Sequence, residues 1–286
     1  MQINLTVILI LLLPLTVFCQ SNEGVFKDSI VISNNTTLIV VGHRGGFDTL
    51  LPENSIALFE HTYEKSCSKP IAIEFDIRES ASGSLFVMHD TTVDRTTNGK
   101  GEIRLLSDSY LETLFLKDKN GNLTTEKIPL FREVLQRFQD KNIILMLDVK
   151  GNIWEKVITL VKQINMESKC IALTFNQQTT KFVFKNCDKL MVSALVKDSI
   201  DWKSLLELNL PGERLIAYVN IDSPAELIKE INSYKVRLMT DMSETSKNSS
   251  KYFSQDYYKS LASSMHLGIL ISDFPLYVNK LFCNEE

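Results

Sequence analysis

At 286 residues the chain is long enough for one large domain or two small ones with a substantial core. Its apolar fraction of 44% and charged fraction of 23% are those of ordinary globular proteins and exclude global disorder. The formal net charge of −4, and the lack of any basic run that could follow a phosphate backbone, argue against nucleic acid as a partner.

An apolar stretch lies near the amino terminus, from Val7 to Val17, interrupted by Pro14. A membrane-spanning helix needs about 20 apolar residues, so this shorter stretch is typical of a signal peptide. We predict that residues 1–20 form a signal peptide cleaved after Cys19 or nearby, and that the mature protein is secreted or extracytoplasmic. The segment before Val7 has no Lys or Arg, which leaves an uncleaved membrane anchor as the alternative.

Export is consistent with the cysteines and the glycosylation sequons. Cleavage leaves four cysteines, an even number that permits two disulfides in an oxidising compartment. The sequence therefore predicts a secreted glycoprotein if the host is eukaryotic. The cysteines are Cys67, Cys170, Cys187 and Cys283, and the sequons begin at Asn34, Asn35, Asn122 and Asn248.

Three short apolar runs in the first third of the chain predict strands, each followed by polar residues. The first ends in G-H-R-G-G, where the glycines allow a tight turn. In the second, alternation sends the isoleucines to one face and leaves Glu74 and Asp76 together on the other. The third ends at His89. The predicted elements are strands 38–41, 71–77 and 85–88 and a helix over 54–66, capped by Asn54 or Ser55.

The rest of the chain alternates regularly between predicted strands and helices. Residues 91–101 read as a polar loop, 105–116 as a weak helix and 120–122 as a turn. Strands that alternate with helices at this spacing indicate parallel pairing through right-handed crossovers. About eight such units predict an α/β protein with one (β/α)8 TIM-barrel domain over residues 38–284. The remaining predicted strands are 143–149, 170–175, 190–196, 215–219, 236–240 and 268–272, and the helices are 129–138, 153–164, 179–186, 202–208, 223–231 and 256–265.

The barrel prediction has consequences for the cysteines and for the polar residues. Cys170 enters a strand and Cys187 ends the next helix, so both are expected at the bottom face, where they could pair. Cys67 and Cys283 are then the leftover candidates. Barrel enzymes keep their active sites at the carboxyl ends of the strands. The polar residues at or just past predicted strand ends are His43, Arg44, Glu74, Asp76, His89, Asp148, Lys150 and Asp273.

The carboxylates predict a metal site. A lone E-x-D pair is more often an exposed acidic face, but Asp148 at the end of another apolar strand favours a shared site. Like charges held close in a half-buried pocket need a cation or a proton to offset them. Oxygen ligands from Glu74, Asp76 and Asp148 suit Mg²⁺ or Ca²⁺ rather than zinc.

Two histidines follow predicted strands, each beside a charged residue. A lone histidine is usually a packed core residue, but His43 and His89 at strand ends fit proton transfer near neutral pH. Arg44 and Lys150 would bind phosphoryl oxygens and offset negative charge in a transition state. One metal, two histidines and two cations together favour phosphodiester cleavage.

The motifs around these residues resemble those of the glycerophosphodiester phosphodiesterase family. They are G-H-R-G-G, L-P-E-N-S, I-E-F-D-I, V-M-H-D and D-R-T-T-N-G-K-G, followed later by I-P-L-F-R-E-V-L, L-M-L-D-V-K and I-S-D-F-P. The resemblance implies a (β/α)8 barrel that hydrolyses glycerophosphodiesters to glycerol 3-phosphate and an alcohol.

The resemblance also implies roles for individual residues. It implies that His43 and His89 are the acid/base pair, with one deprotonating water or the glycerol 2-hydroxyl and the other protonating the leaving oxygen. Arg44 and Lys150 would contact phosphate. Glu53 would orient the site or reach the metal directly. The implied metal ligands are Glu74, Asp76 and Asp148.

Two departures from the family pattern matter. The family usually has Glu-x-Lys where this chain has Asp148 and Lys150, and related venom sphingomyelinase-like phospholipases D use Asp there. A Trp that the family often carries in a V-x-W-T motif is missing from residues 236–240. Alternative functions are a phospholipase D-like or C-like enzyme acting on lysophospholipids with transient membrane-surface contact, or a catalytically inactive secreted binding protein.

Overall fold

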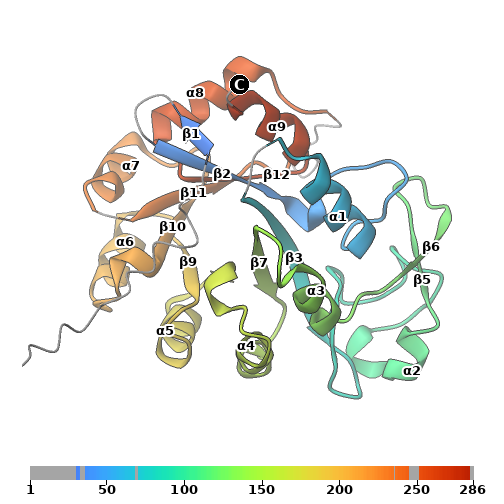
Figure 1. The fold of residues 1–286 in the computed structure, drawn as a ribbon. Coiled ribbons are helices and arrows are strands. Elements are labelled where there is room, and N and C mark those ends of the chain that lie inside the picture. The colour runs from blue at the N-terminus through green and yellow to red at the C-terminus, as the bar shows by residue number, and fades with distance from the viewer. Residues whose placement is uncertain (1–29, 33–35, 68–69, 235, 245–250, 284–286) are drawn as a thin grey trace, which may run out of the picture.

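The structure is a computed structural model that describes residues 30–32, 36–67, 70–234, 236–244 and 251–283. Eight parallel strands form a ring in the order β2-β12-β11-β10-β9-β8-β7-β3, which closes through the pairing of β2 with β3 (Figure 1). The predicted (β/α)8 barrel in a single domain is therefore confirmed. The barrel strands are β2 (Thr36–Gly42), β3 (Ile71–Glu79), β7 (Ile143–Val149), β8 (Cys170–Thr174), β9 (Met191–Leu195), β10 (Leu215–Val219), β11 (Arg237–Asp241) and β12 (Ile269–Ser272).

Each barrel strand is followed by a helix on the outside of the ring (Figure 1). The sequence prediction omitted the last of these helices, which begins with Pro275 in its first turn, where proline is well tolerated. The helices are α1 (Ile56–Lys65), α3 (Phe131–Phe138), α4 (Trp154–Gln163), α5 (Gln177–Asn186), α6 (Ser199–Leu206), α7 (Ala225–Asn232), α8 (Gln255–Met265) and α9 (Pro275–Phe282).

The alternation along the strands separates two apolar cores. On β3, the odd-numbered residues from Ile71 to Ile77 pack outward against the helices, whereas Ala72 packs inside the barrel. Glu74 and Asp76 have the same parity as Ala72 and therefore point into the barrel. The lower part of the interior is apolar, and the carboxylates lie above it at the carboxyl ends of the strands.

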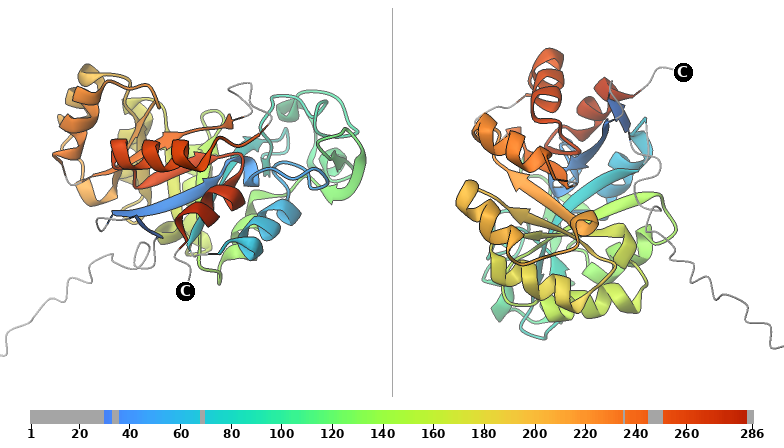
Figure 2. Two further views of the ribbon diagram at one scale, coloured as in Figure 1. Left: turned by 90° about the horizontal axis from the view of Figure 1, so that it is seen from above. Right: turned by 90° about the vertical axis from the view of Figure 1, so that its left-hand side faces the viewer.

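A lobe is inserted between β3 and α3, and Figure 2 shows it beside the barrel. The predicted strand 85–88 is β4 (Leu85–Val87), but it pairs antiparallel with β3 and is no barrel strand. Residues 80–84 are too few for a parallel crossover, which needs a dozen residues or more. Of the predicted helix 105–116, only α2 (Asp108–Leu111) is α-helical. The lobe also contains the hairpin of β5 (Phe115–Lys117) and β6 (Leu123–Lys127).

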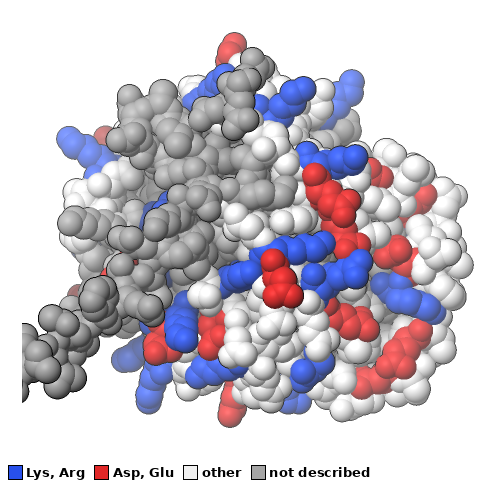
Figure 3. Space-filling model, in the orientation of Figure 1, with Lys and Arg blue, Asp and Glu red and all other residues white. Residues whose placement is uncertain are grey.

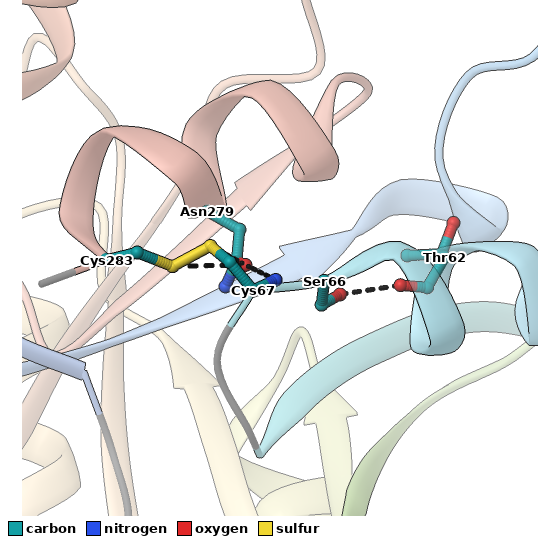
Figure 4. Close-up of a disulfide and its surroundings, with 5 residues drawn as sticks. All are labelled: Thr62, Ser66, Cys67, Asn279 and Cys283. Carbon is teal, nitrogen blue, oxygen red and sulfur yellow. Dashed lines mark hydrogen bonds between the residues drawn. A yellow bond between two sulfur atoms is a disulfide. The ribbon is translucent and has the colours of Figure 1, made fainter. Parts of the chain in front are cut away.

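A disulfide joins Cys67, which follows α1, to Cys283, which follows α9 (Figure 4). The side-chain oxygen of Asn279 accepts a hydrogen bond from the backbone N–H of Cys67 at 3.0 Å. The suggested pairing of Cys170 with Cys187 is wrong, because both are free and buried, whereas the other two candidates, Cys67 and Cys283, do pair. Without α9 in the prediction, nothing in the sequence indicated that Cys283 lies beside the end of α1.

Several predictions fall on residues outside the described part of the chain. These are the signal peptide of residues 1–20 and the sequons at Asn34, Asn35 and Asn248. Asn122 is described and exposed, in the turn between β5 and β6. Within the described ranges, no helix combines the length and the apolar character that crossing a membrane requires. Over the described surface that Figure 3 shows, basic and acidic side chains are interspersed rather than gathered by sign.

Candidate active site

Three carboxylates from two neighbouring strands meet inside the mouth of the barrel. β3 supplies Glu74 and Asp76, and β7 supplies Asp148, which lies beside Asp76 in the parallel register. One oxygen from each residue lies within 4.8 Å of the others. Their exposed fractions are 3%, 1% and 8%. The predicted metal ligands are therefore brought together by the structure.

The cluster carries more negative charge than its surroundings offset. Burial, followed by the charge of Asp76, raises the pKa of Glu74 to about 8. Burial also raises the pKa of Asp148, against the opposing effect of Lys150. The Lys150 ammonium lies 2.6 Å from Asp148 Oδ2 and 3.0 Å from Asp76 Oδ1. Oδ1 of Asp148 is buried without a hydrogen-bond partner. An unpartnered oxygen among crowded carboxylates fits a hard divalent cation.

The turn after β2 places an arginine against this cluster. Arg44 has a left-handed backbone with φ of 52°, and its backbone N–H donates to Glu74 Oε2 at 2.8 Å. Its guanidinium lies 3.1 Å from Glu53 and 3.8 Å from Asp76. The next residue, Gly45, has φ of 94°, and a Cβ there would come within 2.7 Å of the Phe59 ring. Glycine is needed for the turn to bring Arg44 over the carboxylates.

Glu53 and Asn54 hold this part of the site in different ways. Ser55 caps α1, so the side chain of Asn54 is turned instead to Asp76, to which its amide donates at 3.0 Å. The sequence predicted Asn54 or Ser55 as the cap of this helix and did not indicate the contact between Asn54 and Asp76. Glu53 binds Arg44 and Arg95, and it is not among the clustered carboxylates. Its geometry supports the orienting role that the resemblance implied.

His43 has a buried acidic support. Its Nδ1 lies 2.7 Å from Oδ1 of Asp273, which follows β12. Burial lowers the pKa of His43, but the hydrogen bond to Asp273 and the charges of Glu74 and Asp241 outweigh this effect and raise the pKa to about 9. The bond at Nδ1 leaves Nε2 as the nitrogen that can meet a substrate.

A glutamate that the sequence analysis missed holds Asp273 in place. Glu244, which is fully buried, accepts hydrogen bonds from the backbone N–H of Asp273 and from the hydroxyls of Ser272 and Tyr258. Glu244 lies after β11 in no motif, and only the packing of β11 beside β12 brings it to Asp273. The chain Glu244–Asp273–His43 therefore crosses three loops of the barrel mouth.

His89 reaches the site from the inserted lobe. Its Nδ1 lies 2.8 Å from Oδ1 of Asp90, and the guanidinium of Arg78 donates twice to its backbone carbonyl. Arg95 binds both Asp90 and Glu53, which connects the support of His89 to that of Arg44. Asp148 interacts electrostatically with His89, and Glu74 does so with His43. The carboxylate cluster thus lies within electrostatic reach of both histidines.

The geometry defines a TIM-barrel protein with a buried acidic site that suits a cation. Two histidines, each bonded to a carboxylate, lie within electrostatic reach of this site. The model of the Glycerophosphoryl diester phosphodiesterase family matches residues 43–268. The chain belongs to this family.

Curated relatives agree with that membership. A glycerophosphodiester phosphodiesterase of Caldanaerobacter subterraneus is 32% identical over 164 residues, which cover 55% of this chain and 66% of the relative. Glycerophosphodiester phosphodiesterase 1 of Bos taurus is 27% identical over 58% of this chain and 51% of its own length. The match thus spans just under two thirds of one relative and about half of the other.

Two solved structures share the fold. A glycerophosphoryl diester phosphodiesterase of Parabacteroides distasonis is 24% identical with a TM-score of 0.78, covering 91% of this chain and 90% of that one. A phosphodiesterase of Oleispira antarctica, solved in complex with the product sn-glycerol-3-phosphate, is 16% identical with a TM-score of 0.65, covering 85% and 96%. At these identities the likeness concerns the fold.

Proposed function

We propose that the protein is a divalent-metal-dependent phosphodiesterase that hydrolyses glycerophosphodiesters to glycerol 3-phosphate and an alcohol. The observation that carries this proposal is the buried cluster of Glu74, Asp76 and Asp148, which lies within electrostatic reach of two histidines that each bind a carboxylate. Family membership and the activity in the relatives' names support the same substrate class. The product in the Oleispira structure is the phosphate half of such a substrate.

The metal would be held by Glu74, Asp76 and Asp148. Three carboxylate oxygens are the ligands that Mg²⁺ and Ca²⁺ prefer, whereas zinc sites are usually built from nitrogen and sulfur. A bound cation supplies Lewis acidity to a phosphoryl oxygen and offsets charge in the transition state. The unpartnered Oδ1 of Asp148 and the raised pKa of Glu74 both fit such an occupant.

Arg44 and Lys150 would bind the remaining phosphoryl oxygens. Both side chains already lie against the carboxylate cluster, so a phosphate at the cluster is within their reach. Charge-assisted hydrogen bonds from fixed donors stabilise developing negative charge without reorganisation.

The two histidines would divide the proton transfers. A pKa of about 9 keeps His43 protonated at neutral pH, so it suits the general acid that protonates the leaving oxygen as the P–O bond breaks. His89 would act as the base that removes a proton from the attacking hydroxyl. If water is the attacking group, glycerol 3-phosphate and the alcohol form directly. If it is the glycerol 2-hydroxyl, a cyclic phosphate forms first.

An assay of the purified protein tests the proposal. Glycerophosphocholine should be hydrolysed to glycerol 3-phosphate with Mg²⁺ or Ca²⁺ and not with EDTA, and phosphorus NMR would show whether a cyclic phosphate precedes it. Turnover of lysophosphatidylcholine alone would favour the phospholipase alternative. Metal-independent turnover, or none of any phosphodiester, would contradict the proposal.

We further propose that the protein is secreted or extracytoplasmic. The Cys67–Cys283 disulfide supports this, because oxidising compartments favour such bonds. Non-reducing electrophoresis of protein from culture medium and from cells tests it. The oxidised form found only in the medium is the expected result, and a reduced protein confined to the cytosol would contradict it.

A further inference from the structure

A pocket lined largely by charged residues lies between the β5–β6 hairpin and the loop that precedes α1. Its volume is about 270 Å³. The hairpin touches the loop through the side-chain amide of Asn120, which donates to the backbone carbonyl of Thr49 at 3.3 Å. We call this space the hairpin pocket. Its lining includes Phe47, Asp48, Glu53, Arg95, Lys117, Asp118 and Lys119.

Two lining residues, Glu53 and Arg95, link the hairpin pocket to the proposed active site through their ion pairs. Glu53 binds Arg44 at 3.1 Å, and Arg44 lies 3.8 Å from Asp76 in the carboxylate cluster. Arg95 binds Asp90, the support of His89. The hairpin pocket is therefore one ion pair away from both the phosphate-binding arginine and one of the histidines.

The formal charges of the lining residues sum to zero, but these residues differ in how many hydrogen-bonding groups they have left for a ligand. Four N–H···O bonds from Arg95 go to Glu53 and Asp90, out of the five donors of a guanidinium. The Asp118 carboxylate accepts from two backbone N–H groups and one side-chain amide of its own turn. Asp48 accepts from two backbone N–H groups.

The hairpin lysines, in contrast, make few bonds. Lys119 Nζ lies over the Phe47 ring, 4.7 Å from its centroid, and Lys117 Nζ donates one long bond of 3.3 Å to a backbone carbonyl. An ammonium has three donors, so both lysines retain donors for a ligand. Neither lysine forms an ion pair with a carboxylate of the described residues.

We propose that the hairpin pocket receives the alcohol half of the substrate and favours a polyhydroxylated alcohol over one with a quaternary ammonium. This inference rests on the proposed phosphodiesterase function. Hydroxyl groups can accept from the lysines and donate to the carboxylates, so a neutral polyol matches a pocket that has both kinds of group and no formal excess charge. The Phe47 face, which a quaternary ammonium would need, is already covered by the Lys119 ammonium.

The size and character of the pocket argue against an acyl chain as the occupant. Pockets for drug-sized apolar ligands usually exceed about 300 Å³ and are mainly apolar. Here Phe47 and Leu51 are the large apolar side chains of the lining, and six lining residues carry formal charges.

The test compares kcat/KM for glycerophosphoinositol and glycerophosphocholine in the full-length protein with its metal. The wild type should prefer glycerophosphoinositol. Lys117→Gln and Lys119→Gln should each lower the inositol-to-choline ratio about fivefold, mainly through KM, since each removes one charged donor. Lys119→Glu should lower the ratio further, because it both uncovers Phe47 and adds a negative charge.

A matched control lies on the same hairpin. Lys127 donates to the backbone carbonyl of Thr113 and lies over the Phe115 ring, and it does not line the pocket. Lys127→Gln should leave the ratio unchanged, which separates the pocket's effect from a general loss of positive charge on the lobe.

The possible outcomes distinguish the inference from the proposed function. Equal losses of kcat/KM for both substrates in the lysine variants would show that the pocket holds the glycerol half, and unchanged kcat/KM values for both substrates would show that it holds neither half. Either result overturns the inference alone. A wild type that turns over no glycerophosphodiester overturns the proposed function, and the inference falls with it.

Discussion

The two histidines of the site are supported by two different kinds of structure. His43 belongs to the barrel, and behind it lie Asp273 and then Glu244, both buried. His89 belongs to the inserted lobe, and behind it lie Asp90 and then Arg95, whose side chain is 48% exposed. In both cases an imidazole binds a carboxylate that is held by a third residue. The two sets differ in exposure, because the two barrel carboxylates are buried and the lobe residues are partly exposed to solvent.

That difference has energetic consequences. A buried hydrogen-bond acceptor that loses its donor pays the full desolvation penalty, about 1–3 kcal/mol. A pair near the surface is screened by water and salt and contributes about 1 kcal/mol or less. The barrel side of the site should therefore be rigid and costly to change, and the lobe side adaptable and sensitive to salt.

The largest effect is expected when either histidine is removed. His43→Ala and His89→Ala should each lower kcat by about 100-fold to 10,000-fold, the usual contribution of a general acid or base. Only His43→Ala should also lower the free energy of unfolding, by about 1–3 kcal/mol, because it removes the buried hydrogen bond between His43 and Asp273. Kinetics and denaturant unfolding measure both quantities. Near-normal activity in both variants would refute the site assignment.

Changing Glu244 tests the second layer of the barrel support. Glu244→Gln replaces an oxygen that accepts buried hydrogen bonds with a competing donor, and should cost about 1–3 kcal/mol of unfolding free energy. Glu79→Gln, which removes an exposed ion pair with Lys156, is the control and should cost less than about 1 kcal/mol. Equal losses of unfolding free energy in Glu244→Gln and Glu79→Gln would show that the buried hydrogen bonds of Glu244 contribute no more than an exposed ion pair.

The pH profile tests the link between Asp273 and His43. The pKa of His43 is raised, so the protonated form that acts as the acid dominates below about pH 9 and is lost above it. A cation bound near Glu74 would lower this limit somewhat. Asp273→Asn removes a negative charge from His43, and the alkaline limb of kcat should move to lower pH. A limb that stays in place would mean that another group controls it.

The sequence was sufficient for the parts of the fold and site that depend on local periodicity. The alternation along β3 placed Glu74 and Asp76 on one side of the strand, and the register with β7 added Asp148. The antiparallel pairing of β4 with β3 had a local cause that is visible in the sequence, since residues 80–84 cannot hold a crossover helix.

The supports of the site could not be read from the sequence, because their partners are far apart in the chain. Glu244 meets Asp273 only through the packing of β11 beside β12. Arg95 stood in a quoted motif, but its bonds to Glu53 depend on how the lobe folds over the barrel. The sequence left Asn54 and Ser55 as alternative caps of α1, and only the structure shows that Ser55 is the cap and that Asn54 binds Asp76.

The smallest expected effect concerns Arg95 on the lobe side. Arg95→Gln removes ion pairs to Glu53 and Asp90, and because these are partly exposed it should change kcat/KM only about threefold to fivefold. Salt should have the same effect as the substitution, because it screens the ion pairs of Arg95. Raising the ionic strength should therefore lower kcat/KM of the wild type towards that of Arg95→Gln. It should affect the variant less, since the variant lacks the charge that is screened. Glycerophosphocholine turnover at two salt concentrations measures this. An equal salt response in both proteins would mean that Arg95 is not the source of the salt sensitivity. A several-hundredfold loss of kcat/KM in Arg95→Gln would show that the lobe is as rigid a support as the barrel.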